Sequence, residues 1–154
     1  FDSDRPSASD HPMTVKDTTA MIAGMTPVLT EGRWVYCFEP DPARAAACGG
    51  DAFAIIREVE GVTLILPLPV AVALGYDTRL AMARITLNVF SDLEGIGLTA
   101  AVAQALTDAG VSCNMVAAFH HDHAFVPDAD AERAMVALVA AQKAAIRTHV
   151  QPVR

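Results

Sequence analysis

Short blocks of apolar residues alternate with polar or proline-containing segments along the chain, and their spacing predicts small strands and helices. Apolar runs of strand length, rich in β-branched or aromatic side chains, occupy residues 33–38, 62–66, 84–90, 113–119 and 123–126. Helical spacing of apolar residues predicts helices over 14–24, 68–74, 98–109 and from Asp128 or Asp130 onward. This pattern is typical of a mixed domain built from short strands and helices.

The region between the first two strands carries weaker signals. Residues 41–51 follow Pro40 and contain a pair of glycines, so they are predicted to form a loop. Asp51 is expected to cap a short helix that continues through Glu58. Pro27, which precedes the first strand, predicts a turn.

The order of elements repeats along the chain. In each half a buried strand ends at a proline that cannot continue strand pairing, Pro67 after 62–66 and Pro127 after 123–126. The strand at 84–90 lies between the halves and is expected to close one sheet and open the next. The predicted fold class is α+β, with two tandem ferredoxin-like modules of βαββαβ order and helices on one face of antiparallel sheets.

The repeat also predicts how the chain is divided. We expect the first module to span residues 13–80 and the second to span 81–154. Residues 1–12 are polar and contain two prolines, so they are expected to be a disordered leader or an expression remnant. Modules of about 70 residues bury their sheet faces poorly alone, so we expect apolar surface to be used for packing between modules and between chains.

Composition narrows the classes of function. Hydrophobic residues make up 53% of the chain, and 18 acidic against 11 basic residues give a net charge of −7 without a local basic run, which argues against nucleic acid as a partner. The uncharged run 62–76 contains two prolines and is shorter than the roughly 20 residues of a membrane-spanning helix, so no membrane partner is predicted. The three cysteines, Cys37, Cys48 and Cys113, lack CxxC spacing, which favours reduced buried thiols in a cytoplasmic protein.

One loop is a candidate ligand-binding site because it follows a predicted strand and opens a predicted helix. Its residues are Ser91, Asp92, Leu93, Glu94, Gly95, Ile96, Gly97 and Leu98. Free amides at a helix start can hold a carboxylate, and Asp92 can pair with an ammonium group, which together suit an amino acid. Asn114, at the start of the next strand, could bond both groups through its amide. The alternative is an ordinary strand-to-helix connection with capping residues.

A cluster of polar residues, His120, His121, Asp122 and His123, follows the fourth predicted strand. A polar hairpin turn, a ligand or interface role, and a metal site are the three interpretations that this cluster allows. Neighbours along a strand point to opposite faces, and no second cluster is present to complete a metal site, so no metal ligands are predicted. No catalytic motif is evident, and Cys113 lies in an apolar strand, which favours an inert thiol.

The stretch from Arg84 through Val126 resembles the small bacterial ACT-domain proteins. The similarity lies in Ile85-Thr86-Leu87, in the segment 91–100, in Val111-Ser112-Cys113-Asn114 and in His120-His121-Asp122-His123-Ala124-Phe125-Val126-Pro127. The first half fits the same family through segments 25–29, 32–37 and 58–67. The resemblance implies two tandem ACT-like modules, similar to the regulatory half of aspartokinases. It also implies side-by-side pairing of modules, with ligands bound where a strand–helix loop meets a partner's strand, here residues 91–98 and Asn114.

These observations lead to an expected function. We expect a non-catalytic regulatory protein of ACT type that binds a small molecule, with an amino acid as the ligand, as a homodimer and without a cofactor. A structural or partner-binding module without a ligand is the main alternative. A metal-dependent enzyme that uses the histidine cluster is the other.

Overall fold

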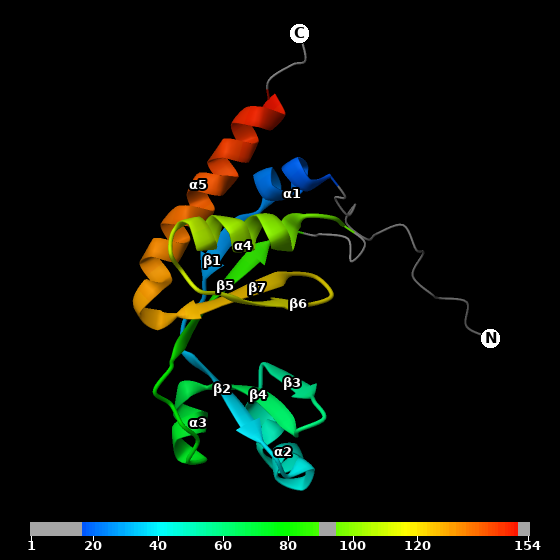
Figure 1. The fold of residues 1–154 in the computed structure, drawn as a ribbon, viewed down its shortest axis with the longest axis vertical. Coiled ribbons are helices and arrows are strands. Elements are labelled where there is room, and N and C mark those ends of the chain that lie inside the picture. Colours follow the sequence, from blue (N-terminus) through cyan, green and yellow to red (C-terminus); the bar gives the residue numbers. More distant parts are fainter. Residues whose placement is uncertain (1–16, 90–94, 151–154) are drawn as a thin grey trace, which may run out of the picture.

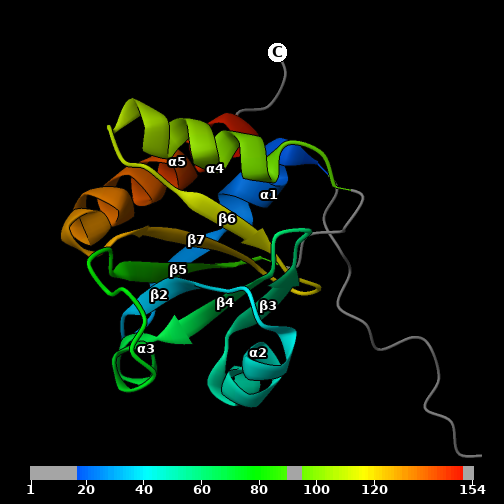
Figure 2. The ribbon, with the colours of Figure 1, turned by 60° about the horizontal axis from the view of Figure 1, so that its bottom comes forward.

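Seven strands form one curled antiparallel sheet in the part of the chain that the computed structural model describes, residues 17–89 and 95–150 (Figures 1 and 2). The strands are β1 (Thr26–Leu29), β2 (Trp34–Glu39), β3 (Ala54–Arg57), β4 (Val62–Pro67), β5 (Met82–Asn88), β6 (Asn114–Ala117) and β7 (Asp122–Pro127). The helices are α1 (Thr18–Gly24), α2 (Pro42–Cys48), α3 (Leu68–Ala73), α4 (Leu98–Asp108) and α5 (Ala131–Val150), with 3-10 turns at Gly49–Asp51 and Asp128–Asp130. The helices pack on the outer face of the curled sheet, and the opposite face is free of helices (Figure 2).

The sheet consists of two ferredoxin-like units that share β5. The strand order is β3-β4-β2-β5-β7-β6, and β1 also pairs with β5. β5 contacts the first unit where Met82 pairs with Trp34, and it pairs along its length with β7 of the second unit. The expectation that this strand joins the two halves is therefore confirmed.

The two units also use the same corner at the end of a buried strand. β4 and β7 both end at a proline, and the residue after each proline donates its backbone N–H across the sheet. Leu68 N donates to Arg33 O at 2.8 Å, and Asp128 N donates to Ala81 O at 3.0 Å. Helices α3 and α5 follow these corners, so the predicted repeat is present in the structure.

The N-terminal segment packs against elements that come much later in the chain. β1 pairs antiparallel with β5, from Thr26 opposite Asn88 to Leu29 opposite Ile85, and thereby supplies the fourth strand beside β5, β7 and β6. Met21 of α1 lies in the same buried cluster as the side chains of α4 and α5. Residues 34–80 are thus inserted between two parts of the second unit, and the division of the chain at residues 80 and 81 stays a prediction.

Strand alternation produces three separate apolar clusters. On the helix-covered face, Leu64 belongs to a cluster beneath α2 and α3, and Ile85 belongs to a larger one beneath α1, α4 and α5. On the helix-free face, Phe125, Ile65 and Met82 are almost fully buried. The third cluster explains why the sheet curls, because side chains of the two units can bury each other only when this face is concave.

Three predictions about the first half are wrong. Residues 42–48 form helix α2 instead of a loop, because Asp41 accepts a hydrogen bond from Ala43 N and Pro42 suits the first helical turn. The helix expected from Asp51 to Glu58 is strand β3, whose residues pair with β4. The Pro27 region is also a strand, since β1 pairs in the described sheet with β5 alone and an edge strand tolerates proline.

Candidate functional site

Helix α4 begins at Leu98, and its N-cap residue, Gly97, lies in the left-handed region with φ +100°. In the described parts of the chain no side chain caps this helix start. A Cβ on Gly97 would lie 2.8 Å from Thr18 Oγ1, and that hydroxyl donates to Ile96 O. The first backbone N–H groups of α4 therefore lack a side-chain cap, and contact with α1 fixes the position of the helix start. The described loop residues that lead into this helix are Gly95, Ile96, Gly97 and Leu98. Of the predicted loop, residues 91–94 lie outside the described part.

A buried carboxylate lies beside this helix start. Asp122, the first residue of β7, is 7% exposed, and its Oδ2 accepts from Thr99 Oγ1 in the first turn of α4 at 3.4 Å. Burial raises the pKa of Asp122, while the Thr99 hydrogen bond and the charge of His121 act in the opposite direction. The structure thus places a buried carboxylate against the first turn of α4, whose uncapped backbone N–H groups form the positive end of the helix.

The rings of His120 and His121 are neighbours, 6.4 Å apart, whereas His123 lies on another face of the sheet. The exposed His120 stacks edge-on against Phe119, and His121 Nδ1 lies 3.4 Å from Val89 O. His123 lies on the helix-free face, where its Nδ1 is 3.0 Å from Thr86 Oγ1. Within residues 17–89 and 95–150, no three His, Cys, Asp or Glu side chains gather as metal ligands.

His123 and its neighbours form a charged region inside the concave face. The Arg84 guanidinium lies against the rings of both Trp34 and Phe53, 4.6 and 4.7 Å from their centres. Burial, followed by the charges of Arg84 and His121, lowers the pKa of His123. The rings of Trp34 and Phe53 also contact Phe125, so these aromatic contacts hold the two units together.

Asn114 is not brought to the start of α4 within one chain. It pairs with Phe125, whereas Ala117 at the other end of β6 pairs with Asp122. Asn114 and Ala117 are three residues apart along β6, which corresponds to a separation of roughly 10 Å. Asn114 also shares the helix-free face with Val116, and there it lines a cavity with Tyr36, while α4 covers the other face.

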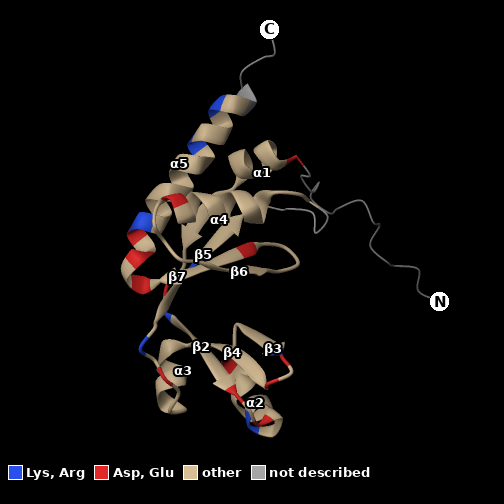
Figure 3. Cartoon of the chain, viewed as in Figure 1, with Lys and Arg blue, Asp and Glu red and all other residues tan. Residues whose placement is uncertain are grey.

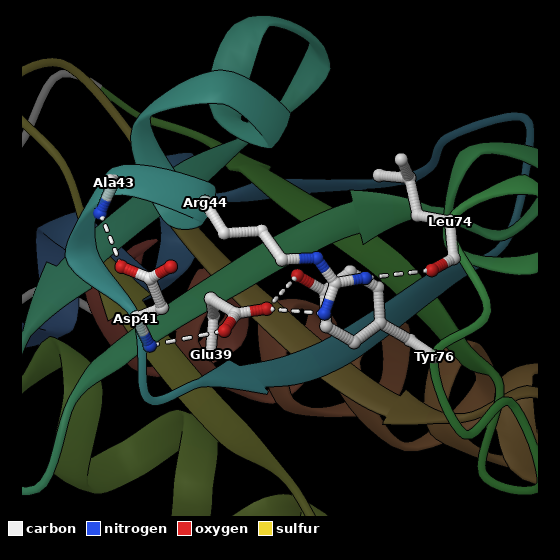
Figure 4. Close-up of polar contacts among 6 residues, drawn as sticks. All are labelled: Glu39, Asp41, Ala43, Arg44, Leu74 and Tyr76. Atoms are coloured by element: carbon white, nitrogen blue, oxygen red, sulfur yellow. Dashed lines mark hydrogen bonds and ion pairs between the residues drawn. The ribbon is translucent and has the colours of Figure 1, made fainter.

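A buried acidic residue that the sequence reasoning missed joins the parts of the first unit (Figure 4). Glu39 is 3% exposed, and its Oε2 accepts from Arg44 Nη1 at 2.9 Å and from Tyr76 OH at 2.8 Å. Its Oε1 accepts from Asp41 N, and Arg44 Nη2 donates to Leu74 O. This network ties β2, α2 and the segment after α3 together, and an acid that ends an apolar strand is the signal that could have revealed it.

Two of the cysteines, Cys37 and Cys113, are poor nucleophiles. Burial raises the pKa of Cys37 to about 11 and also raises that of Cys113. All three cysteines are free thiols. Thiols with raised pKa values stay protonated at neutral pH, which agrees with the expected inert role.

Residues 14–83 match the family model of an ACT domain, and residues 79–140 match a second ACT-domain model. The chain belongs to the ACT-domain family. Its ACT domains are arranged in tandem and support a regulatory role. None of the helices in the described residues is both long and apolar enough to cross a membrane.

Solved structures resemble this ACT-domain protein over most of its length. A Vibrio cholerae protein of unknown function, named as a possible transport protein, is 33% identical, with a TM-score of 0.71 over 80% of this chain and 94% of that chain. An Agrobacterium tumefaciens protein is 17% identical, with a TM-score of 0.58 over 77% and 89% of the two chains. The ligand-free regulatory subunit of Thermus thermophilus aspartate kinase shares the fold at 15% identity, with a TM-score of 0.56 over 77% and 98%. No curated protein matches the chain.

Proposed function

We propose that this ACT-domain protein is a non-catalytic regulatory module that binds an amino acid at the start of α4. The tandem pair of ACT domains is the observation that carries the proposal, because ACT domains typically serve regulation. A ring nitrogen of His121 faces Val89 O and one of His123 faces Thr86 Oγ1, contacts that do not favour a shared metal ion and hence a metal-dependent enzyme. A module that binds only a protein partner remains the alternative, and the experiments below separate the two.

The groups at the start of α4 are complementary to a zwitterion. The first backbone N–H groups of the helix, at Leu98 and Thr99, can bind the ligand's carboxylate, aided by the positive end of the helix. The buried Asp122 can accept from the ligand's ammonium group, because its described polar contact with Thr99 is long, at 3.4 Å. An ammonium at this place would lower the pKa of Asp122 and hold it ionised.

Titration calorimetry with each of the twenty amino acids tests this proposal. At least one amino acid is expected to bind, and Asp122→Asn is expected to weaken it tenfold or more, which matches the loss of a hydrogen bond to a charged group. Asn is isosteric, and burial already disfavours the charge of Asp122, so the variant is expected to fold.

The matched control is Asp51→Asn, which removes an exposed carboxylate in the first unit and is expected to leave binding unchanged. Heat in none of the twenty titrations would contradict amino-acid binding. Capture of a protein partner under the same conditions would then favour the partner-binding alternative.

The proposal includes a homodimer formed through the edge of β3. This strand ends the described sheet, and it exposes 48% of Ile55 and 43% of Ile56, an apolar edge that favours pairing with another strand. Basic residues in the view of Figure 3 are scattered on α5, on α2 and where the units join, which does not suggest nucleic acid as the partner.

Sedimentation equilibrium tests the dimer. The expected mass is about twice 16.2 kDa, and Ile56→Lys is expected to yield monomers. Val59→Lys changes a fully exposed residue in the nearby turn and serves as the control. A monomer at all protein concentrations would contradict the dimer but would leave ligand binding to be judged by calorimetry.

A further inference from the structure

Little backbone pairing joins the two ferredoxin-like units. β2 of the first unit and β5 share a single residue pair, Trp34 with Met82, whereas β2 pairs with β4 over its whole length. The chain passes from one unit to the other in segments 30–33 and 74–81, the two links between the upper and lower parts of Figure 1. The relative position of the units therefore depends largely on side chains.

Aromatic rings supply most of the side-chain contact between the units. The fully buried Phe125 of β7 lies 6.4 Å from the Trp34 ring and 5.4 Å from the Phe53 ring, measured between ring centres, and both of these rings belong to the first unit. The ion pair between Arg33, in a connecting segment, and Asp128 is exposed, and such pairs add little. The aromatic contacts are thus the main link between the units.

Two basic side chains of the second unit lie against one ring of the first unit. The guanidinium carbon of Arg84 is 4.7 Å from the centre of the Phe53 ring, and the His123 ring centre is 5.0 Å from it. Arg84 Nε donates to Thr30 Oγ1 at 3.1 Å, and His123 Nδ1 lies 3.0 Å from Thr86 Oγ1. The clamp is the set of five side chains that make these contacts between the units: Trp34, Phe53, Arg84, His123 and Phe125.

No negative charge balances the basic groups of the clamp. Within residues 17–89 and 95–150, no carboxylate forms an ion pair with Arg84 or His123. Asp122, the neighbour of His123 along β7, lies on the opposite face of the sheet. The charges that act on His123 come from Arg84 and from His121 in the hairpin turn, while β6 has no titratable residue and Phe53 is uncharged.

The protonation state of His123 decides how many cations the closed clamp contains. Burial, followed by the charges of Arg84 and His121, lowers the pKa of His123, so its ring is neutral at neutral pH. Protonation in acid places a second positive charge near Arg84 in a region shielded from water, where like charges repel more strongly than in bulk solvent. Separation of the units exposes both groups to water and relieves this repulsion.

We propose that protonation of His123 opens the clamp and lets the two units move apart about segments 30–33 and 74–81. Each segment contains a glycine with positive φ, Gly32 at +86° and Gly75 at +79°, and a Cβ at either position would meet no atom within 4 Å beyond the chain neighbours. Both links thus have room to change direction. Each unit has its own apolar cluster beneath its helices, so each stays folded when the clamp opens.

The test uses the fluorescence of Trp34, the single tryptophan of the chain, whose indole nitrogen is buried in the closed clamp. Quenching by acrylamide is measured from about pH 7.5 to about pH 4.5, which covers the titration of a histidine with a lowered pKa. As the pH falls, the quenching constant is expected to rise roughly twofold or more and the radius of gyration in small-angle X-ray scattering to increase, while far-UV circular dichroism is unchanged. A quenching constant that stays level until the circular dichroism signal is lost would overturn the proposal.

Two histidine variants separate this opening from other effects of acid. His123→Gln stays neutral at every pH and is expected to keep the quenching constant at its neutral-pH value. His120→Gln removes an exposed histidine that contacts Phe119 in the hairpin turn, and as the matched control it is expected to open like the unchanged protein. A full response in His123→Gln would overturn the proposal, and so would a response that is lost equally in both variants.

Arg84→Gln tests whether repulsion between like charges is the cause. This variant is expected to raise the pKa of His123, measured by NMR of its ring protons, because the charge of Arg84 holds that pKa down. An unchanged pKa of His123 in Arg84→Gln would overturn the repulsion on which the proposal rests. The proposed function is judged separately by calorimetry at neutral pH, so either proposal can fail while the other stands.

Discussion

Replacing Gly97 with alanine is expected to destabilise the start of α4, where the proposed ligand site lies. The glycine has φ +100°, a conformation that costs a residue with a Cβ about 1–2 kcal/mol. The new Cβ would also lie 2.8 Å from Thr18 Oγ1 and 2.9 Å from Thr18 Cγ2, so the threonine must move or the helix must shift. Overpacking of this kind adds about 1 kcal/mol. The expected loss in the free energy of unfolding is therefore about 2–3 kcal/mol.

A double-mutant cycle separates the two contributions. Thr18→Ala removes the atoms that would meet the new Cβ, so Gly97→Ala is expected to cost only about 1–2 kcal/mol in that background. The measurement is urea denaturation followed by circular dichroism, in which a loss of 2 kcal/mol lowers the midpoint by about 1 M when the m-value is about 2 kcal/mol/M. A loss below 0.5 kcal/mol in the free energy of unfolding on Gly97→Ala would refute this reasoning. An equal loss on the order of 3 kcal/mol with Thr18 and with Thr18→Ala would also refute it, because Thr18 would then play no part.

Three further predictions concern other parts of the fold. The pKa of Glu39 is lowered from 4.5, chiefly by the hydrogen bond from Asp41 N, so the stability that the Glu39 carboxylate contributes is present above pH 4.5 and is lost as the pH falls. The difference in urea midpoint between Glu39→Gln and the unchanged protein is therefore expected to narrow on acidification. A difference that stays constant with pH would contradict this. The pKa of His123 is lowered from 6.5, so this side chain is protonated more readily in the unfolded chain than in the folded one. The free energy of unfolding is therefore expected to fall as the pH drops below 6.5. An NMR titration that places the pKa of His123 above 6.5 in the folded protein would refute this. Phe125→Ala is expected to lower the free energy of unfolding by about 3–5 kcal/mol, because Phe125 is fully buried. The fluorescence of the single tryptophan, Trp34, whose ring centre lies 6.4 Å from that of Phe125, reports the unfolding. A loss below 1 kcal/mol would show that Phe125 is not a core residue.

The apolar runs predicted the central strands well, because these strands are buried and their side chains alternate. β2, β4 and β5 and the proline corners at Pro67 and Pro127 follow from local composition alone. The prediction failed where a long-range partner decides the structure. Residues 54–57 have an ambiguous apolar pattern, and their pairing with β4 makes them a strand. Pro27 lies in a strand because an edge position on β5 is open to it.

The candidate site shows the same limit. Local sequence identified Gly97 and the start of α4, since a glycine before an apolar helix is a local signal. It could not show that Asp122 lies against that helix, because their proximity depends on the hairpin of β6 and β7 packing beneath α4. It also grouped Asn114 with the loop in a site between partner modules, and within one chain strand alternation places Asn114 on the face opposite α4.

The most direct test of amino-acid binding is an NMR titration of the ¹⁵N-labelled protein with each of the twenty amino acids. The proposed function predicts that at least one of them shifts the backbone amides of Leu98 and Thr99 in a saturable manner, since those N–H groups would bind the ligand's carboxylate. Twenty titrations in which no amide shifts in a saturable manner would contradict the claim that this ACT-domain protein binds an amino acid.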